Sequence, residues 1–199
     1  KRSFKDMLVE QKFLVLAFFV PFLIMGIAFA VHDVYPFGDE QILVTDFWQQ
    51  YYPFFCNFQE KLKEGSSMLW SWGAGLGTNY IALIAYYLAS PLNLLLFFVP
   101  AEFLREALTV SLMIKIGCSG MFTAMFLRKV FKRNDFSIVF FSMLFALCAF
   151  TMGYYWNIIW FDAFALFPLV MLGVYRLLVQ GKYKTYVVSL ALAMLTNYY

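Results

Sequence analysis

Five long apolar stretches are the feature that most constrains this chain of 199 residues. The first covers residues 13–31, and its 19 residues carry no formal charge, which is enough for one bilayer crossing at about 1.5 Å of rise per residue. Only 14% of all residues are charged, whereas soluble domains contain about a quarter. The sequence therefore predicts an all-α polytopic membrane protein, with spans at about 13–31, 107–127, 136–156, 163–179 and 186–199.

The first stretch has a second interpretation, a cleaved signal peptide. A basic leader precedes it, and Ala28-Phe29-Ala30 resembles the small-residue cleavage site of such peptides. Signal-peptide cores are usually about 7–15 residues long, so the length of this stretch favours a membrane span. The chain starts without Met and stops inside an apolar run, and we expect it to be an N-terminal fragment of a longer protein.

Residues 80–99 form an apolar segment that Ser90-Pro91-Leu92-Asn93 interrupts near its middle. If this segment crosses the bilayer once, the basic loops after residues 127 and 179 both lie on the side opposite the basic N-terminus. If it does not cross, nearly all Lys and Arg residues lie on one side. Because cytoplasmic loops carry the excess of Lys and Arg, the pattern predicts a segment that dips into the membrane and returns, or lies at its interface.

The same charge pattern predicts a cytoplasmic N-terminus and a large outside region, about residues 32–106, between the first two spans. We expect residues 1–199 to form a single membrane domain. The basic residues on the predicted cytoplasmic side are Lys1, Arg2, Lys5, Lys12, Arg128, Lys129, Lys132, Arg133, Arg176, Lys182 and Lys184. Those outside are Lys61, Lys63 and Arg105, and Lys115 lies within a span.

Residues 47–63 of the outside region have apolar side chains at helical spacing, which predicts an amphipathic helix on the membrane surface. Its aromatic residues are expected in lipid, while its amides and Lys61 face water or substrate. Gly65 is expected to end the helix, and Pro53 implies a kink or a late start. Asp46 then has two compatible roles: a capping carboxylate, or an ionised group that acts as a base or ligand at the mouth of a cavity.

Other candidates in the outside region have ordinary explanations. Asp39 and Glu40 follow a turn and suit solvated loop acids. The glycine-rich loop of residues 70–80 can bring backbone N–H groups close to a phosphate or a sugar, or can be a membrane-surface turn framed by aromatic residues. No basic run with interleaved aromatics indicates nucleic-acid binding, and three dispersed cysteines imply neither a disulfide framework nor a zinc site.

Lys115 is unusual because it lies near the middle of a predicted span, where a charge is costly and marks a functional candidate. Its partner is either a phosphate or a carboxylate such as Asp162 or Asp46. Asp162 begins a later span as a cap or a second cavity carboxylate. Asn197 is polar where an apolar residue would be expected, and small residues such as Gly120 suit close helix packing.

Taken as a set, several short motifs resemble the bacterial YfhO-type membrane protein family. The resemblance covers most of the chain and matches the N-terminal part of a longer family. The motifs are Asp46-x-x-x-Gln50-Tyr51; Gly75-Leu76-Gly77-x-Asn79; Tyr86-Tyr87-Leu88-x-Ser90-Pro91-Leu92-Asn93-Leu94-Leu95; Lys115-Ile116-Gly117; Trp160-x-Asp162 with Pro168; and Asn197-Tyr198-Tyr199.

That family is similar to the GT-C glycosyltransferases, which use a polyprenyl-phosphate-linked sugar and carry a catalytic Asp in the first large outside loop. The resemblance implies a multi-pass protein of the bacterial cell membrane, with an extracytoplasmic active site and a lipoteichoic or wall teichoic acid as acceptor. It implies Asp46 as the catalytic residue, with Asp39 of the pair Asp39-Glu40 in reserve. It implies no certain cofactor and leaves room for a divalent metal. The substrate-binding candidates are Gln50, Tyr51, Asn79, Lys115, Asp162 and Asn197.

Three functions fit these patterns. The first is an inverting transferase, in which Asp46 activates the acceptor hydroxyl and Lys115 or Arg105 stabilises the departing phosphate. The second is a flippase or transporter of a lipid-linked sugar, for which an intramembrane charge and a broken segment are also typical. The third is a non-catalytic scaffold.

Overall fold

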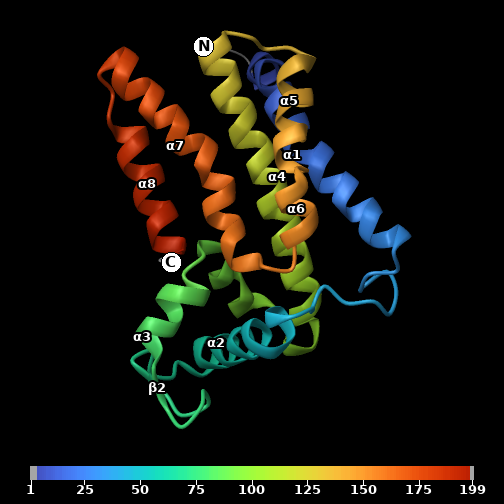
Figure 1. Ribbon diagram of the computed structural model, residues 1–199, viewed down its shortest axis with the longest axis vertical. Helices are drawn as coiled ribbons and strands as arrows, with labels where there is room; N and C mark the ends of the chain where they lie inside the picture. The colour runs from blue at the N-terminus through green and yellow to red at the C-terminus, as the bar shows by residue number, and fades with distance from the viewer. Residues whose placement is uncertain (1–3, 198–199) are drawn as a thin grey trace.

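Four helices of this chain are long and apolar enough to cross a membrane: Gln11–Val31, Ala101–Phe131, Phe136–Tyr154 and Ile158–Gln180. The computed structural model describes residues 4–197. The helices of the bundle stand side by side (Figure 1). They are α1 (Phe4–Val31), α4 (Leu104–Phe131), α5 (Phe136–Ala146), α6 (Ala149–Tyr154), α7 (Phe161–Gln180) and α8 (Lys184–Thr196). The predicted all-α polytopic membrane fold is confirmed.

The third predicted span is interrupted rather than continuous. The helix stops at Ala146 and restarts at Ala149, and the Thr151 hydroxyl donates a hydrogen bond of 2.8 Å to the Ala146 carbonyl oxygen. That bond satisfies a carbonyl left without its helical partner. The span predicted at about 136–156 corresponds to the candidate span Phe136–Tyr154, which α5 and α6 form together.

Small residues set the distances between the bundle helices. A Cβ atom at Gly120 of α4 would lie 2.2 Å from the carbonyl oxygen of Ala17 in α1. A Cβ atom at Gly173 of α7 would lie 2.4 Å from the Cα atom of Tyr186 in α8. Because any larger residue would push the backbones apart, these glycines allow the close packing that the sequence predicted for Gly120.

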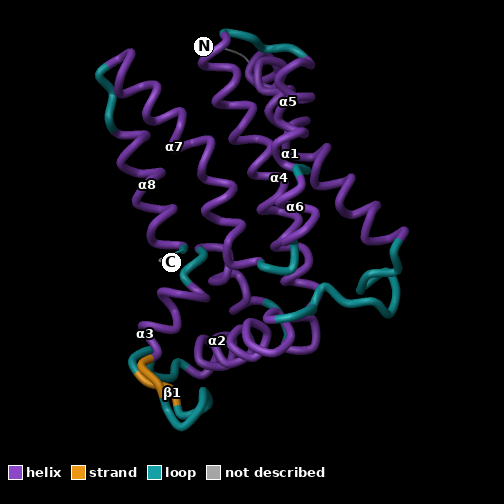
Figure 2. The backbone as a smooth tube through the Cα atoms, viewed as in Figure 1, coloured by secondary structure: helices purple, strands orange, loops and turns teal. Residues whose placement is uncertain are grey.

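A layer of shorter segments lies across one end of the bundle and forms the region between α1 and α4 (Figure 2). Its two strands form a small antiparallel hairpin, with Trp70 opposite Asn79. In chain order the layer contains η1 (Phe47–Tyr51), α2 (Tyr52–Glu64), β1 (Trp70–Ser71), β2 (Thr78–Asn79), α3 (Tyr80–Leu83), η2 (Ile84–Leu88), η3 (Pro91–Phe98) and η4 (Ala101–Phe103). A short turn, η5 (Ile158–Trp160), precedes α7.

The apolar segment of residues 80–99 is bent, as its interrupting Ser-Pro predicted. The part Tyr80–Leu88 and the part Pro91–Phe98 meet at 103°. Pro91 has no backbone N–H to continue the preceding helix, and Ser90 adopts an extended conformation before it. We call residues 80–98 the bent segment.

The helix predicted over 47–63 exists, but its aromatic face contacts protein rather than lipid. It begins as the π-helical turn η1, continues as α2 with Pro53 in the first turn, and ends at Gly65, whose φ is 66°. Phe47, Tyr51, Phe55 and Phe58 are buried in the main core. The assignment of this face to lipid is wrong because these rings are buried in protein, against the bent segment.

Lys61 also departs from its predicted place on the polar face. Only 9% of Lys61 is exposed. Its ammonium donates to the carbonyl oxygens of Ser67 at 2.8 Å and Trp70 at 3.1 Å, and lies 4.9 Å from the centre of the Tyr80 ring. These contacts, from the hairpin that follows α2, replace the water that the sequence pattern assigned to Lys61.

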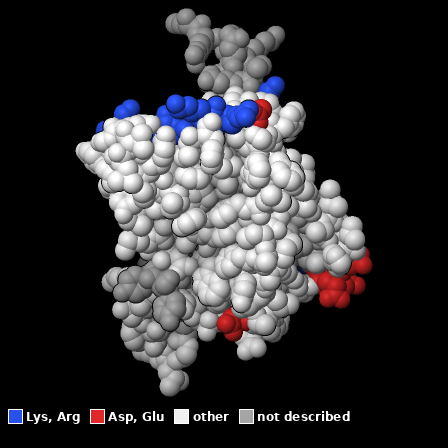
Figure 3. Space-filling model, turned by 45° about the horizontal axis from the view of Figure 1, so that its top comes forward, with Lys and Arg blue, Asp and Glu red and all other residues white. Residues whose placement is uncertain are grey.

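Charge is segregated along the bundle. Figure 3 shows lysine and arginine side chains in a band across one end, with most of the visible acidic side chains toward the other. The α4–α5 and α7–α8 connections lie at that basic end (Figure 1), where Arg128 and Lys129 occupy the last turn of α4. Lys1 and Arg2 lie outside the described residues. The separation agrees with the predicted topology, and the side of the bilayer stays a prediction.

Candidate functional site

A buried ion pair joins helices α4 and α7. Lys115 of α4 and Asp162 of α7 are 2.6 Å apart between Nζ and Oδ2, and their side chains are only 3% and 10% exposed. Asp162 lies in the first turn of α7, where the helix dipole favours a negative charge. A charge placed inside a membrane bundle needs such a partner, so a carboxylate satisfies Lys115 in this structure.

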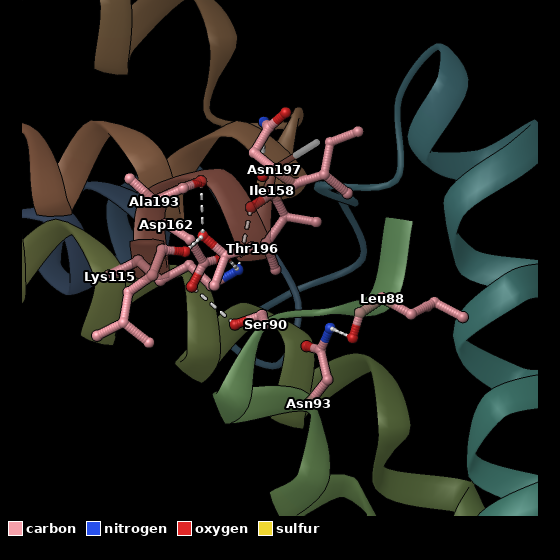
Figure 4. Close-up of polar contacts among 11 residues, drawn as sticks. Leu88, Ser90, Asn93, Lys115, Ile158, Asp162, Ala193, Thr196 and Asn197 are labelled. Atoms are coloured by element: carbon pink, nitrogen blue, oxygen red, sulfur yellow. Dashed lines mark hydrogen bonds and ion pairs between the residues drawn. The ribbon is translucent and has the colours of Figure 1, made fainter. Parts of the chain in front are cut away.

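Two further groups complete this cluster, which Figure 4 shows in close-up. The Lys115 ammonium also donates to the Ile158 carbonyl oxygen at 3.1 Å. The Ser90 hydroxyl donates to Oδ1 of Asp162 at 2.7 Å. Both carboxylate oxygens of Asp162 are therefore hydrogen-bonded, which reduces the cost of burying its charge. We call Ser90, Lys115 and Asp162 the buried cluster.

The buried cluster links the bundle to the bent segment at its break. Ser90 precedes Pro91 and η3, and its neighbour Asn93 is 2% exposed and donates to the Leu88 carbonyl oxygen at 2.9 Å. That bond satisfies a carbonyl that the interrupted helix leaves without a backbone donor. Contacts on both sides of the break therefore hold the 103° bend in place.

Asn197 lies next to the buried cluster without joining it. Its amide nitrogen donates to the Ile159 carbonyl oxygen at 3.2 Å, one residue beyond the carbonyl that Lys115 contacts. It follows α8 directly and so connects α8 to η5. Tyr198 and Tyr199 of the same sequence motif lie outside the described residues.

A second group of polar and aromatic side chains lies on the layer below the bundle. The Tyr87 hydroxyl donates to Oε1 of Gln50 at 3.0 Å. Its ring centre is 5.6 Å from that of Tyr51 and 4.9 Å from that of Phe54. Asp46 is exposed at the start of η1, one turn before Gln50. We call Asp46, Gln50, Tyr51 and Tyr87 the surface cluster.

Burial and the charge of Asp46 both raise the pKa of two tyrosines of this cluster, Tyr51 and Tyr87. Burial, together with the nearby Asp46 carboxylate and Tyr87 hydroxyl, raises the pKa of Tyr51 to about 12. A neutral phenol is a hydrogen-bond donor as well as an acceptor. At neutral pH the Tyr51 hydroxyl therefore keeps its proton and can donate a hydrogen bond to a ligand oxygen.

Asp46 does not cap its helix. It occupies the N-cap position, but its backbone is in the right-handed helical region and its side chain makes no capping hydrogen bond. A capping side chain normally needs an extended backbone to reach the first free N–H groups. The capping role is wrong, and the carboxylate stays available to other groups.

The two clusters are close because one short stretch contributes to both. Tyr87 belongs to the surface cluster and Ser90 to the buried cluster, and three peptide units limit the distance between their Cα atoms to about 11 Å. Tyr87 and Ser90 were not among the site residues chosen from the sequence. A hydroxyl in an apolar segment directly before Pro91 was the signal that could have identified Ser90.

The other predicted site residues lie elsewhere or serve local structure. Asn79 caps α3 by accepting from the N–H groups of Ile81 and Ala82, and its residue is exposed. Asp39 is exposed in the loop after α1. The Arg105 guanidinium lies 4.3 Å from the centre of the Tyr35 ring, at the beginning of α4.

No group of three or more His, Cys, Asp or Glu side chains suited to a metal ion occurs within residues 4–197. Asp162 is bonded to Lys115 and Ser90, whereas Asp39 and Asp46 are exposed. The arrangement offers hydrogen-bonding and charged groups from protein side chains: an exposed carboxylate, an amide and phenols, beside a buried ammonium.

The comparisons with known proteins give one match. The sequence model of a family described as bacterial membrane protein YfhO matches residues 17–199. No curated protein and no solved structure matches the chain.

Proposed function

The chain belongs to the bacterial membrane protein YfhO family, and from this premise and the two clusters we propose that it is a membrane glycosyltransferase. It moves a sugar from a polyprenyl-phosphate donor to a cell-surface polymer such as lipoteichoic or wall teichoic acid, on the extracytoplasmic face. The observation that supports this most directly is the Asp46 carboxylate, which is exposed, makes no capping hydrogen bond and lies beside Gln50, Tyr51 and Tyr87.

Asp46 acts as the general base. It accepts the proton of the acceptor hydroxyl as the hydroxyl oxygen forms a bond to the anomeric carbon of the sugar. The bond from that carbon to the phosphate oxygen breaks, and its electron pair leaves with the polyprenyl phosphate. Because attack and departure occur on opposite sides of the carbon, the configuration inverts. Gln50 and the two tyrosines offer hydrogen bonds and ring faces to the sugar.

The departing phosphate carries negative charge that a cation must stabilise. Lys115 is the first candidate, because its ammonium binds the Asp162 carboxylate in this structure and could bind a phosphate oxygen in its place. Arg105 is the second candidate, because it lies against Tyr35 rather than in an ion pair with a described residue. Lys115→Met and Arg105→Gln separate these roles by their effects on turnover.

The main test replaces Asp46 by Asn, which keeps the size of the side chain and removes the base. Sugar incorporation into the polymer should be lost, while the amount of protein in the membrane is unchanged. Asp39→Asn is the matched control, since Asp39 is also an exposed acid of the same region. Normal incorporation by the Asp46 variant would overturn its role as base, and loss only in the Asp39 variant would transfer that role.

Translocation of a lipid-linked sugar is a second candidate function. The 103° bend in an apolar segment, held by a buried charge pair, is also typical of a substrate path through a membrane bundle. Purified protein in vesicles separates the two functions. Transfer of sugar to an added acceptor supports the transferase, and movement of the intact lipid-linked sugar without transfer supports the flippase.

A further inference from the structure

The basic end of the bundle is formed by two short connections between apolar helices. Residues 132–135 join α4 to α5, and residues 181–183 join α7 to α8. Residues 128–135 contain four cations and one acid, and residues 176–184 contain three cations and no acid, so the net charge of each stretch is +3. We call the seven cationic side chains the basic band (Figure 3): Arg128, Lys129, Lys132, Arg133, Arg176, Lys182 and Lys184.

The arginines of the basic band are bonded within the protein, whereas its lysines are not. The three arginines have partners within the chain, namely Gln11, Asp135 and Thr185. The four lysines are exposed, and among the described residues their ammonium groups make no hydrogen bond or ion pair. Each ammonium has three N–H donors, so the lysines are the groups that this end offers to an anion outside the protein.

Aromatic side chains are exposed beside these lysines. Phe131 and Phe136 flank the α4–α5 connection and are 64% and 71% exposed. Tyr183 lies in the α7–α8 connection, between two lysines of the band, and is 60% exposed. Aromatic rings are enriched where the hydrocarbon of a bilayer meets its headgroups, and lysine side chains there extend their ammonium groups toward the headgroups. The combination places the basic band at that boundary.

The mixture of rings and ammonium groups distinguishes between anionic partners. A nucleic acid or an acidic soluble protein approaches from water, and its charges would pair with the lysines while Phe131 and Phe136 stayed exposed. A phospholipid covers both kinds of group, because its phosphate meets the ammonium groups and its acyl chains meet the rings. The surroundings of the two connections therefore match a lipid whose headgroup has a net negative charge.

We propose that the basic band binds the headgroups of anionic phospholipids in the leaflet that surrounds this end of the bundle. Lys129 and Lys132 bind them at the α4–α5 connection, and Lys182 and Lys184 bind them at the α7–α8 connection. One lysine near an anionic membrane surface strengthens association about fivefold. The inference is independent of the proposed function, because the basic band and the layer that carries the surface cluster lie at opposite ends of the bundle (Figure 1).

Electron paramagnetic resonance of spin-labelled lipids tests the site in the full-length protein. The protein is reconstituted into phosphatidylcholine vesicles that contain a trace of phosphatidylglycerol or of phosphatidylcholine, each with the spin label on an acyl chain. The spectrum separates lipids at the protein boundary from free lipids and so gives a relative association constant. One variant replaces Lys129 and Lys132 by Gln, a second replaces Lys182 and Lys184 by Gln, and a third combines all four changes. Arg at the same positions is the matched control, because it keeps the charge.

The wild-type protein should prefer phosphatidylglycerol about fivefold, and 1 M salt should remove the preference because it shortens the Debye length to about 3 Å. Each double Gln variant should lose part of the preference, the fourfold Gln variant should lose all of it, and the Arg variants should keep it. The two double variants test each connection separately if the fourfold variant does not elute as a folded protein in size-exclusion chromatography. Equal association of the two lipids with the wild type, or a preference that the Gln substitutions leave unchanged, would overturn the proposal.

Discussion

Three residues at the interior of the bundle, Ser90, Lys115 and Asp162, combine a buried ion pair with a charge-assisted hydrogen bond. Their hydrogen bonds of 2.6 and 2.7 Å are short, and the charged pair is almost fully buried. Charge-assisted bonds of this kind are about twice as strong as neutral ones. Under the proposed function, stability and catalysis would depend on the same atoms, because the carboxylate that satisfies Lys115 would compete with the donor phosphate for it.

Removing one partner of the buried pair should destabilise the protein strongly. Asp162→Asn or Lys115→Met leaves an uncompensated buried charge, which costs about 3–5 kcal/mol of unfolding free energy. The double variant Lys115→Met, Asp162→Leu should recover most of that loss. Thermal unfolding in detergent measures all three variants.

The exposed pair of Arg133 and Asp135 provides the control for that measurement. Its charged atoms are 3.6 Å apart and its side chains are 69% and 45% exposed, so Arg133→Gln should cost less than about 1 kcal/mol. A small effect of Asp162→Asn, equal to that of Arg133→Gln, would contradict a structural role for the buried pair.

The raised pKa of Tyr51 predicts a loss of stability at high pH. An unfolded tyrosine ionises near pH 10, whereas the folded protein keeps the Tyr51 proton up to about pH 12. Between these values only the unfolded state releases the proton, so stability falls as the pH rises. Tyr51→Phe should reduce this fall, and Tyr183→Phe, at a 60% exposed residue, should not. Identical pH profiles for wild type and Tyr51→Phe would contradict the assignment.

Helix α2 acts as a clamp on the bent segment. Gln59 is only 3% exposed, and its amide nitrogen donates to the carbonyl oxygens of Leu96 and Val99, both at 3.0 Å. Lys63 donates to the same Val99 oxygen at 2.5 Å. The end of η3, where the Val99 N–H donates to the Leu96 carbonyl oxygen, thus receives further hydrogen bonds from another element.

Replacing Gln59 by Leu should loosen the bent segment. Each carbonyl oxygen loses one donor and keeps another, the Val99 N–H for Leu96 and Lys63 for Val99, so each lost hydrogen bond costs about 0.5–1.5 kcal/mol. Amide hydrogen exchange in residues 91–99 should become faster. Gln49→Leu is the matched control, because Gln49 is exposed on η1. Unchanged exchange in the Gln59 variant would show that packing alone holds the segment.

The whole molecule separates a basic end from a polar layer at the opposite end of its apolar bundle (Figure 3). That separation predicts which loops face the cytoplasm. Single cysteines at Leu76, which is 99% exposed in the hairpin, and at Lys182 between α7 and α8 test it in a background without Cys56, Cys118 and Cys148. An impermeant thiol reagent should label the first in intact cells and the second only after permeabilisation. The reverse result would place the surface cluster in the cytoplasm.

The sequence by itself determined four of the five predicted spans, the break at Ser90-Pro91 and the helix that ends at Gly65. The fifth predicted span, 186–199, corresponds to α8 (Lys184–Thr196), a shorter apolar helix. These features depend on local properties: the length of apolar runs, the missing N–H of proline and the conformational freedom of glycine. The sequence also indicated Lys115 and gave Asp162 as one of its candidate partners, because a charge in an apolar run is costly without a partner.

Only the tertiary structure decided how these elements combine. It paired Asp162 with Lys115 and Ser90, and it turned the aromatic face of α2 toward protein. It also buried Lys61 against the hairpin and left Asp46 without a capping bond. Each outcome depends on segments far apart in the chain. Helical periodicity shows which side chains share a face, but it does not show whether lipid, water or another helix covers that face.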